Sequence, residues 1–244
     1  MPSYKMVNRR RIIDKIYHAE QVSVVLNSMY EACTRINSDK FSYHFKPLFG
    51  HHDLDGTEVF AVGFPEDWVA RYNLPTIQVS DPVPQTIMKA GRVMTWSDAI
   101  GETDLSDAEK CFIKAARDSG IIHGIGIPLW GPDGQNAYAS LGFPNDQLGR
   151  QLDRIFETQL LVQAGHQKIC ELVRKNRPEI SISAREAEVL TWMGRGKSKT
   201  DIATILNISP DTVTTYVRRS YEKLGSSDRV GAVVRALKLG LIRL

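Results

Sequence analysis

The residues whose types and spacing point most clearly to a chemistry lie on one predicted helix, residues 210–224. Helical spacing places Thr214, Thr215, Arg218 and Arg219 on its outer face. Short hydroxyls followed one turn later by guanidiniums suit a helix whose N-terminal half enters the major groove of DNA. A solvated helix face that carries a few basic residues is the simpler alternative.

Local signals predict the elements that position this face. Ser183 and Ser198 each begin a capping box, in which a hydroxyl and an acidic side chain three residues later satisfy each other's backbone N–H groups. Ser209 caps the helix that follows, with Pro210 at the first position, where its missing N–H costs nothing. Two short helices joined by a tight turn at Asn207 indicate a helix-turn-helix. This agreement of caps, turn and apolar spacing favours DNA reading over a plain solvated face.

A set of positions in the last quarter of the chain follows a known pattern: Glu186, Leu190, Gly196, Ile202, Ala203, Ile208, Ser209, Thr212, Val213, Lys223, Leu224, Arg229, Gly240, Leu241 and Ile242. These positions resemble the C-terminal DNA-binding domain of LuxR-type regulators. Tyr216 stands where a His is usual in that family, and Ser220 stands where an aliphatic residue is usual. The resemblance implies a C-terminal all-α four-helix helix-turn-helix domain over residues 182–244. Lys197 is expected at its flank, close to DNA phosphates.

Charge is unevenly distributed along the 244 residues, a length sufficient for two domains. From Asn176 onward the chain has 12 Lys and Arg against 7 Asp and Glu, whereas the preceding residues have 19 against 21. The basic excess therefore accompanies the predicted DNA-reading helix, as phosphate binding requires.

Cysteine usage and hydropathy predict the compartment. Cys33, Cys111 and Cys170 are odd in number and widely spaced, and no apolar signal segment follows the start. These features argue against a disulfide framework in an exported protein. Cys111 lies on a predicted helix without a catalytic signature, so we expect it in the core. No apolar run approaches the ~18 residues of a membrane span, so no membrane partner and a cytoplasmic location are expected.

The first 174 residues predict helices around consecutive strands. Helical periodicity covers residues 12–36 as one long helix and 148–172 as another, with shorter helices after Pro65, Asp81 and Ser106, and alternation predicts strands over 41–49, 57–62, 123–129 and 137–143. This order predicts an α+β fold, an N-terminal α-β-α sandwich with an antiparallel sheet. A linker over residues 175–181 should separate it from the DNA-binding domain.

A second pattern lies within these elements and runs in the order Trp68, Tyr72, Asp81–Pro82, Trp96, Gly124 and Pro128. The order and spacing resemble the autoinducer-binding domain of the same family, over about residues 41–143. The resemblance implies an N-acyl-homoserine lactone as effector ligand, with no cofactor. It also implies that residues 1–174 bind this ligand and support dimerisation.

The chemistry of such a lactone matches these residue types. Its lactone carbonyl, amide N–H and amide carbonyl each need a partner when buried, because an unpaired polar group costs about 1–3 kcal/mol. The Trp68 indole can donate to the lactone carbonyl, and the Asp81 carboxylate can accept from the amide N–H. By the resemblance, Ser140 donates its hydroxyl to the amide carbonyl, and Tyr72 and Trp96 form walls of the pocket.

Phe64 departs from the family, because many members have a Tyr there that gives the amide carbonyl a second donor. Taken singly, the aromatic residues fit a plain core equally well, and Asp81 fits a helix cap before Pro82. Family spacing upstream of a family DNA-binding domain favours ligand binding.

Three other motifs fail on spacing. Gly196-Lys197-Ser198 lacks the first glycine of a phosphate-binding loop, and Gly124-Ile125-Gly126 lacks the third glycine of a dinucleotide fingerprint. His51 and His52 have no third ligand nearby, so we expect a loop there and no metal site.

Two further expectations concern activity and assembly. The alternative to a regulator is a lactone-processing enzyme fused to a DNA-binding tail, with Asp81 and His123 as its hydrolytic groups. A regulator would have no catalytic residues. We also expect a homodimer joined through residues 152–172 and through a last helix that begins at Ser227 and carries apolar residues over 230–237.

Overall fold

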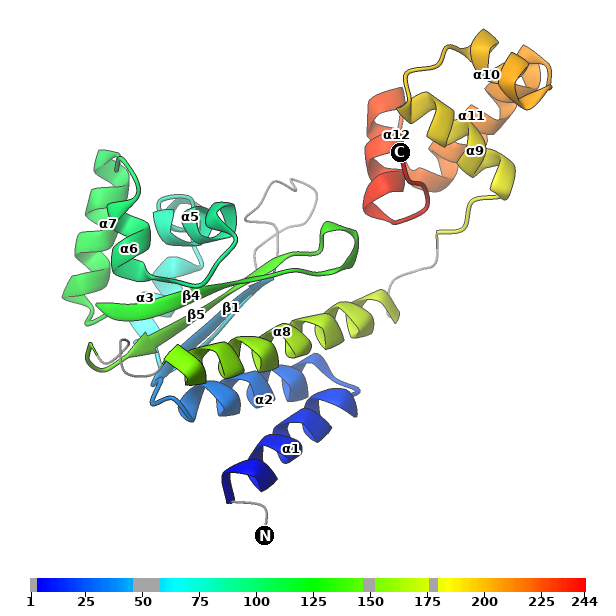
Figure 1. Cartoon of the computed structure of the whole chain (residues 1–244). Helices are drawn as coiled ribbons and strands as arrows, with labels where there is room; N and C mark the ends of the chain where they lie inside the picture. Colours follow the sequence, from blue (N-terminus) through cyan, green and yellow to red (C-terminus); the bar gives the residue numbers. More distant parts are fainter. Residues whose placement is uncertain (1–3, 46–57, 147–151, 176–179) are drawn as a thin grey trace. The chain divides into compact units, whose positions relative to one another are not determined.

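A computed structural model describes residues 4–45, 58–146, 152–175 and 180–244. The chain divides into two compact units, Met1–Lys175 and Asn176–Leu244, which are described separately below (Figure 1). In the described residues, no helix is both long enough and apolar enough to cross a membrane.

The N-terminal unit is built on a five-stranded antiparallel sheet in the order β2-β1-β5-β4-β3. Its strands are β1 (Lys40–Phe45), β2 (Glu58–Val62), β3 (Met94–Thr95), β4 (His123–Leu129) and β5 (Ala137–Phe143). The predicted hairpin of β4 and β5 is confirmed at its stated bounds. A short 3₁₀ turn, Pro132–Gly134, joins these two strands.

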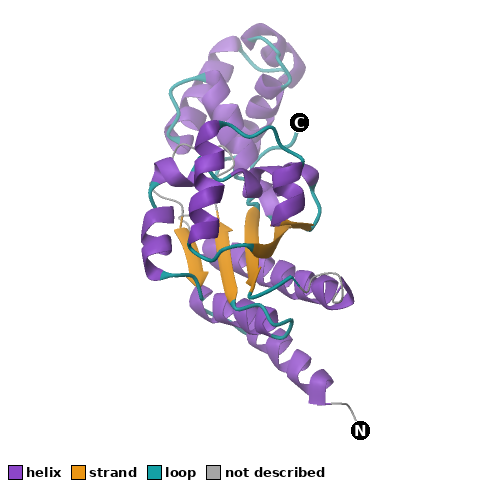
Figure 2. Cartoon of the chain, turned by 90° about the vertical axis from the view of Figure 1, so that its left-hand side faces the viewer, coloured by secondary structure: helices purple, strands orange, loops and turns teal. Residues whose placement is uncertain are grey.

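Helices cover both faces of this sheet, and the predicted α+β fold with an α-β-α sandwich is confirmed (Figure 2). One layer consists of α1 (Tyr4–Tyr17), α2 (Val22–Thr34) and α8 (Leu152–Lys175). The other contains α3 (Glu66–Tyr72), α4 (Pro75–Gln78), α5 (Pro82–Ala90), α6 (Trp96–Gly101) and α7 (Asp107–Asp118).

The two faces of the sheet differ because side chains alternate along each strand. On β1, Phe41 and Tyr43 pack into the main apolar core with α2 and α8, whereas Ser42 and His44 are buried on the opposite face. Leu141 joins the same apolar core from β5. The face toward α3, α5, α6 and α7 is thus the more polar one.

The single long helix predicted over residues 12–36 is wrong. The segment forms α1 and α2, which pack against each other, and the Lys15 ammonium lies 2.6 Å from the Glu31 carboxylate. Folding back lets Ile16 and Met29 enter one core, which a continuous helix would hold far apart. Periodicity did not reveal the break because the apolar spacing continues across the short turn. Residues 46–57, with the turn predicted at 50–53, lie outside the described residues.

The C-terminal unit contains α9 (Ala184–Gly194), α10 (Lys199–Leu206), α11 (Pro210–Leu224) and α12 (Arg229–Lys238). The predicted capping boxes at Ser183 and Ser198 and the cap at Ser209 are confirmed. Asn207 makes the tight turn with φ of 52°. The last helix begins at Arg229 and not at Ser227, because the Asp228 carboxylate accepts the Gly231 N–H at 2.9 Å and acts as the cap.

Candidate functional site

A pocket lies between the polar face of the sheet and the helices α3, α5, α6 and α7. Its cavity volume of about 110 Å³ is several times the ~10–15 Å³ that one water needs. All six residues predicted to bind the ligand line it: Phe64, Trp68, Tyr72, Asp81, Trp96 and Ser140. The structure therefore brings these residues together from separate elements.

The strands supply the floor of the pocket. Ser42 pairs with Ser140, and His44 pairs with Tyr138, so two rungs of the β1–β5 ladder place four polar side chains on one face. Space above β4 depends on its glycines, because a Cβ at Gly124 would collide with the Trp96 ring. Glycine is thus required where Trp96 approaches the strand.

Two helices place an aromatic side chain beside a carboxylate. Trp68 and Tyr72 are four residues apart on α3 and therefore share a face, which packs against the Phe112 ring at centroid distances of 5.5 and 6.1 Å. The Tyr72 hydroxyl donates to Asp81 Oδ2 at 2.8 Å, and the Val83 N–H donates to Asp81 Oδ1 at 3.0 Å. Asp81 is therefore both the cap of α5 and a wall of the pocket.

The electrostatic state of Asp81 is unusual. Burial raises the pKa of Asp81 to about 6, although the hydrogen bonds from Tyr72 and Val83 act in the opposite direction. Each carboxylate oxygen retains a lone pair for a further donor. A buried amide N–H in the pocket could occupy that position.

Trp96 is tied to the floor, since its indole Nε1–H donates to Ser140 Oγ at 3.1 Å. A serine hydroxyl that accepts one bond still has its own proton to donate. Ser140 can thus donate to a carbonyl in the pocket while Trp96 holds it in place.

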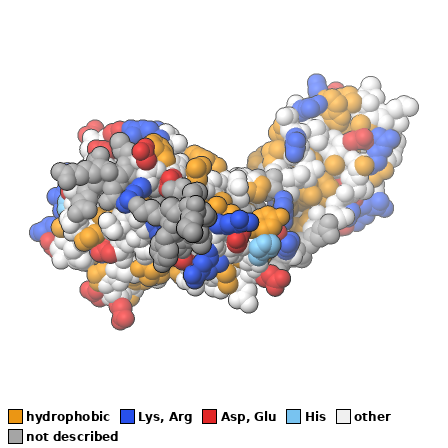
Figure 3. Space-filling model, turned by 60° about the horizontal axis from the view of Figure 1, so that its bottom comes forward, with side chains coloured by type: hydrophobic (Ala, Val, Ile, Leu, Met, Phe, Trp, Pro, Cys, Tyr) orange, Lys and Arg blue, Asp and Glu red, His pale blue; other side chains and the backbone are white. Residues whose placement is uncertain are grey.

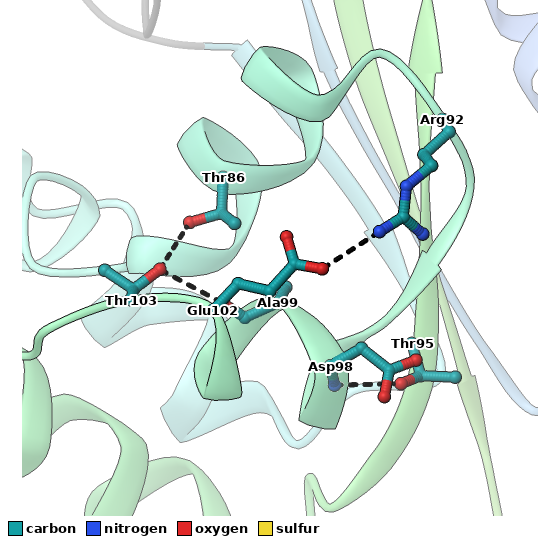
Figure 4. Close-up of polar contacts among 7 residues, drawn as sticks. All are labelled: Thr86, Arg92, Thr95, Asp98, Ala99, Glu102 and Thr103. Carbon is teal, nitrogen blue, oxygen red and sulfur yellow. Dashed lines mark hydrogen bonds and ion pairs between the residues drawn. The ribbon is translucent and has the colours of Figure 1, made fainter.

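Polar contacts of Thr86, Arg92, Thr95 and Thr103 cap α6, the helix that begins at Trp96, and tie its C-terminal end to α5 and to the segment after α5 (Figure 4). The Thr86 and Thr103 hydroxyls lie 3.0 Å apart, and Thr103 also donates to the Ala99 carbonyl at 3.1 Å. Thr95 caps α6 by accepting the Asp98 N–H at 3.0 Å. An exposed ion pair of 2.9 Å joins Arg92 and Glu102, the residue that follows α6.

Sequence reasoning missed three polar residues of the floor: Ser42, His44 and Tyr138. Alternation within the predicted strands was a signal for them, because Tyr138 lies two residues from the predicted Ser140 on one strand, and Ser42 and His44 lie two residues apart on another and so share a face. That signal could not be used without the strand pairing.

The predicted DNA-contacting residues occupy the surface of the C-terminal unit. Thr214, Arg218 and Arg219 are exposed on α11, Thr215 is partly exposed, and Lys197 is exposed just before α10. The Arg218 guanidinium forms an i,i+4 ion pair of 3.0 Å with Glu222, and the threonine hydroxyls donate to carbonyls one turn earlier. Figure 3 shows Lys and Arg side chains (blue) on the visible face of this unit.

Three residues that carry the family resemblance act as internal supports of this unit. The Glu186 carboxylate is buried and lies 2.7 Å from the Lys223 ammonium, which joins α9 to α11. Arg229 donates to the carbonyls of Met193 and Lys197 at 2.8 and 2.6 Å. These bonds hold the turn between α9 and α10 against α12.

Two expectations about chemistry outside the pocket have clear outcomes. Cys111 is exposed, so its predicted place in the core is wrong, because it falls on the outer face of α7, whose buried residue is Ile113. His123 stands at the start of β4 and is not among the pocket residues, so the structure does not bring it together with Asp81 as an enzyme would require. In the described part of the chain, no cluster of His, Cys, Asp or Glu could hold a metal ion.

Comparisons with known proteins cover both units. Residues 22–169 match the family model "Autoinducer binding domain", and residues 180–236 match "Bacterial regulatory proteins, luxR family". The chain is 32% identical over 189 residues to the quorum sensing-dependent transcriptional regulator RpaR of Rhodopseudomonas palustris, covering 75% of each chain. It is 28% identical to the quorum-sensing regulator RhlR of Pseudomonas aeruginosa, covering 76% of each. The crystal structure of Escherichia coli SdiA has the same fold, with a TM-score of 0.76, 23% identity and coverage of 98% of this chain and 99% of that one.

Proposed function

This chain belongs to the LuxR-type quorum-sensing transcriptional regulators, and we propose that an N-acyl-homoserine lactone is the effector held in its pocket. It binds an autoinducer and DNA and is not an enzyme, so the lactone-processing alternative is set aside. Within the proposal, residues 1–174 form the domain that binds the ligand and dimerises, and residues 175–181 form the linker. Residues 182–244 form the domain that binds DNA. The protein acts in the cytoplasm.

The observation that carries the lactone assignment is that the pocket lining combines apolar side chains with a few polar groups. Apolar side chains such as Val59, Ile100 and Ile113 surround a few polar groups, as the acyl tail and polar head of the lactone require. In the proposed complex, Trp68 donates to the lactone carbonyl and Asp81 accepts the amide N–H. Ser140 donates to the amide carbonyl.

The other three predicted side chains shape the site. Tyr72 orients the Asp81 carboxylate through its 2.8 Å hydrogen bond, and Trp96 orients Ser140 through its 3.1 Å bond. Phe64 closes the pocket without contributing a hydroxyl.

Incubation of the protein with a molar excess of lactones of increasing chain length tests this function. We expect stoichiometric retention of one intact lactone after gel filtration, identified by mass spectrometry. The ring-opened acyl-homoserine is the matched control, because it keeps the tail and amide but replaces the lactone carbonyl with a carboxylate. Turnover of the lactone, or equal retention of both compounds, would contradict the proposal.

On DNA, we assign Thr214, Thr215 and Arg218 to base edges, since the two threonines lie in the N-terminal half of α11 and Arg218 follows about one turn later on the same face. Arg219 and Lys197 are assigned to phosphates. Groove-reading helices of this kind usually insert their N-terminal residues.

A homodimer would cover apolar side chains that each unit leaves exposed. On α8, Phe156 and Leu160 are 59% and 72% exposed, and on α12, Val230 and Val234 are 70% and 41% exposed. Burying such side chains is favourable by about 1.5–3 kcal/mol each. Sedimentation should therefore give a dimer on DNA, and Leu160→Glu should shift it toward monomer. A wild-type monomer bound to DNA would contradict this arrangement.

A further inference from the structure

His44 is a buried polar residue of the pocket to which the proposed function gives no role. It lies on β1, is 3% exposed and faces the cavity. Its Nε2 is 2.9 Å from Ser42 Oγ, whereas its Nδ1 has no hydrogen-bond partner among the described residues. Buried polar atoms without partners are rare in folded proteins, so a group outside the protein is expected to satisfy this nitrogen.

The imidazole is neutral and held in place. Burial lowers the pKa of His44 to about 3, so at physiological pH one ring nitrogen is a donor and the other an acceptor. The rings of Tyr72 and Tyr138 contact it edge-on at centroid distances of 5.5 and 5.3 Å. Because the Ser42 hydroxyl can donate or accept, Nδ1 can take either role.

Strand pairing places His44 close to the polar head of the proposed ligand. Ser140 is opposite Ser42 across the β1–β5 ladder, and His44 is two residues further along β1, about 6.5–7 Å. An oxygen that reaches His44 therefore belongs to atoms a few bonds from the carbonyl that Ser140 binds.

The polar atoms of an unsubstituted acyl-homoserine lactone are already matched by Trp68, Asp81 and Ser140. We propose that the natural effector carries one more oxygen near its amide, a keto or hydroxyl group on the third acyl carbon, and that His44 Nδ1 hydrogen-bonds to it. This inference rests on the lactone function proposed above and names the substitution of its acyl chain.

The test is a calorimetric titration of the full chain with three lactones of equal chain length: unsubstituted, 3-oxo and 3-hydroxy. A buried nitrogen left without a partner should weaken the unsubstituted ligand about tenfold or more relative to the better oxygenated one. A keto oxygen only accepts, whereas a hydroxyl donates or accepts, so a preference for 3-hydroxy alone identifies Nδ1 as the acceptor.

Two variants and a control separate this role from folding. His44→Phe keeps an aromatic ring at this position but removes both nitrogens. We therefore expect its affinities for the three lactones to converge within about twofold. His44→Asn keeps a polar atom near the position of Nδ1 and should retain a preference for an oxygenated ligand. His123→Phe makes the same change outside the pocket and should leave the wild-type preference intact. Thermal melting of each ligand-free variant checks its fold.

Equal binding of all three lactones to the wild type, or a preference that persists in His44→Phe, overturns the inference. Absence of binding by all three instead overturns the lactone function itself, so the two failures are distinct. If His44→Phe does not fold, the ¹⁵N shift of Nδ1 in the wild type decides, since only the oxygenated ligand should move it.

Discussion

Two carboxylates, the buried Glu186 of the C-terminal unit and the partly buried Asp81 of the N-terminal unit, differ in a way that separates ligand binding from folding. Burial alone would raise the pKa of Glu186, but hydrogen bonds from Lys223 and Ser183 bring it below its usual value. Asp81 also receives hydrogen bonds, from Tyr72 and Val83, yet burial prevails and raises its pKa to about 6. Glu186 is thus fully compensated within the protein, whereas Asp81 has spare capacity that a ligand can use.

The surroundings of the two carboxylates differ as well: one unit has a packed core, and the other has a cavity. The apolar core of the C-terminal unit is well packed, and Leu190, Val213 and Leu224 within it are fully buried. Asp81 instead faces a cavity lined by side chains from several elements. The comparison indicates that the C-terminal unit completes its own core, while the N-terminal unit leaves part of its interior for an effector.

The largest expected effect is the loss of ligand affinity in Asp81→Asn. Replacing a charged acceptor by a neutral amide of similar shape should weaken binding roughly ten- to hundredfold, because charge-assisted bonds contribute about 1.5–3 kcal/mol. Calorimetry measures the affinity, and melting of the ligand-free protein should change little. Glu186→Gln is the matched control, expected to lower the melting temperature of the C-terminal unit and to leave ligand affinity unchanged. Unchanged affinity in Asp81→Asn would reduce Asp81 to a helix cap.

On the DNA side, Arg218→Ala should remove about 1–3 kcal/mol of discrimination at one base-pair position and leave non-specific binding nearly intact. Lys197→Ala should weaken binding to DNA of every sequence alike and reduce the steepness of log affinity against log salt concentration by about one unit. Salt titrations on operator and scrambled DNA distinguish these outcomes. Equal loss on both DNAs in Arg218→Ala would make Arg218 a phosphate contact.

The raised pKa of Asp81 predicts a pH dependence of binding. Below pH 6 the carboxyl of the ligand-free protein becomes protonated and loses its charge-assisted bond, so affinity should fall up to about tenfold by pH 5. The free energy of unfolding of the ligand-free protein changes in the opposite direction. Because the pKa of Asp81 is higher in the folded than in the unfolded state, the folded state binds this proton more tightly. Proton binding by Asp81 therefore stabilises the fold below pH 6, and this contribution is lost as the pH rises through 6. Calorimetry between pH 5 and 7 measures the first effect, and Asp81→Asn should abolish it.

A smaller effect is expected at Ser220, which is fully buried on α11 and whose hydroxyl has no partner in the described residues. Ser220→Ala should stabilise the C-terminal unit by about 1 kcal/mol, because it removes an unsatisfied polar group. Ser209→Ala, which removes the cap of the same helix, should destabilise it by about 1 kcal/mol. Urea denaturation compares the two, and destabilisation by Ser220→Ala would show that the hydroxyl is satisfied in solution.

An effect of similar size, on ligand affinity, is expected from Phe64→Tyr. The added hydroxyl restores the donor that the family resemblance leads us to expect, and it should tighten lactone binding by about 1 kcal/mol, roughly fivefold. A titration against the wild type measures it. Weaker binding would indicate that Phe64 is fitted to the ligand as an apolar wall.

Sequence alone predicted most of the C-terminal unit. The caps at Ser183, Ser198 and Ser209 and the bounds of α11 are confirmed, because a cap links groups only two or three residues apart. The hairpin of β4 and β5 was equally local. The start of the last helix was misplaced by two residues, because Asp228 competes with Ser227 as the cap.

Only the tertiary structure decided which further side chains share the pocket with the six that the family pattern had named. The family pattern named Trp68, Asp81 and Ser140, and their contacts with a ligand remain part of the proposal. His44 was not found in the sequence, because its neighbours are set by the pairing of β1 with β5, strands far apart in the chain. Periodicity also missed the break between α1 and α2 and the exposure of Cys111. It gives the spacing of apolar residues along a helix. Packing against other elements determines where the helix ends and which of its faces is buried.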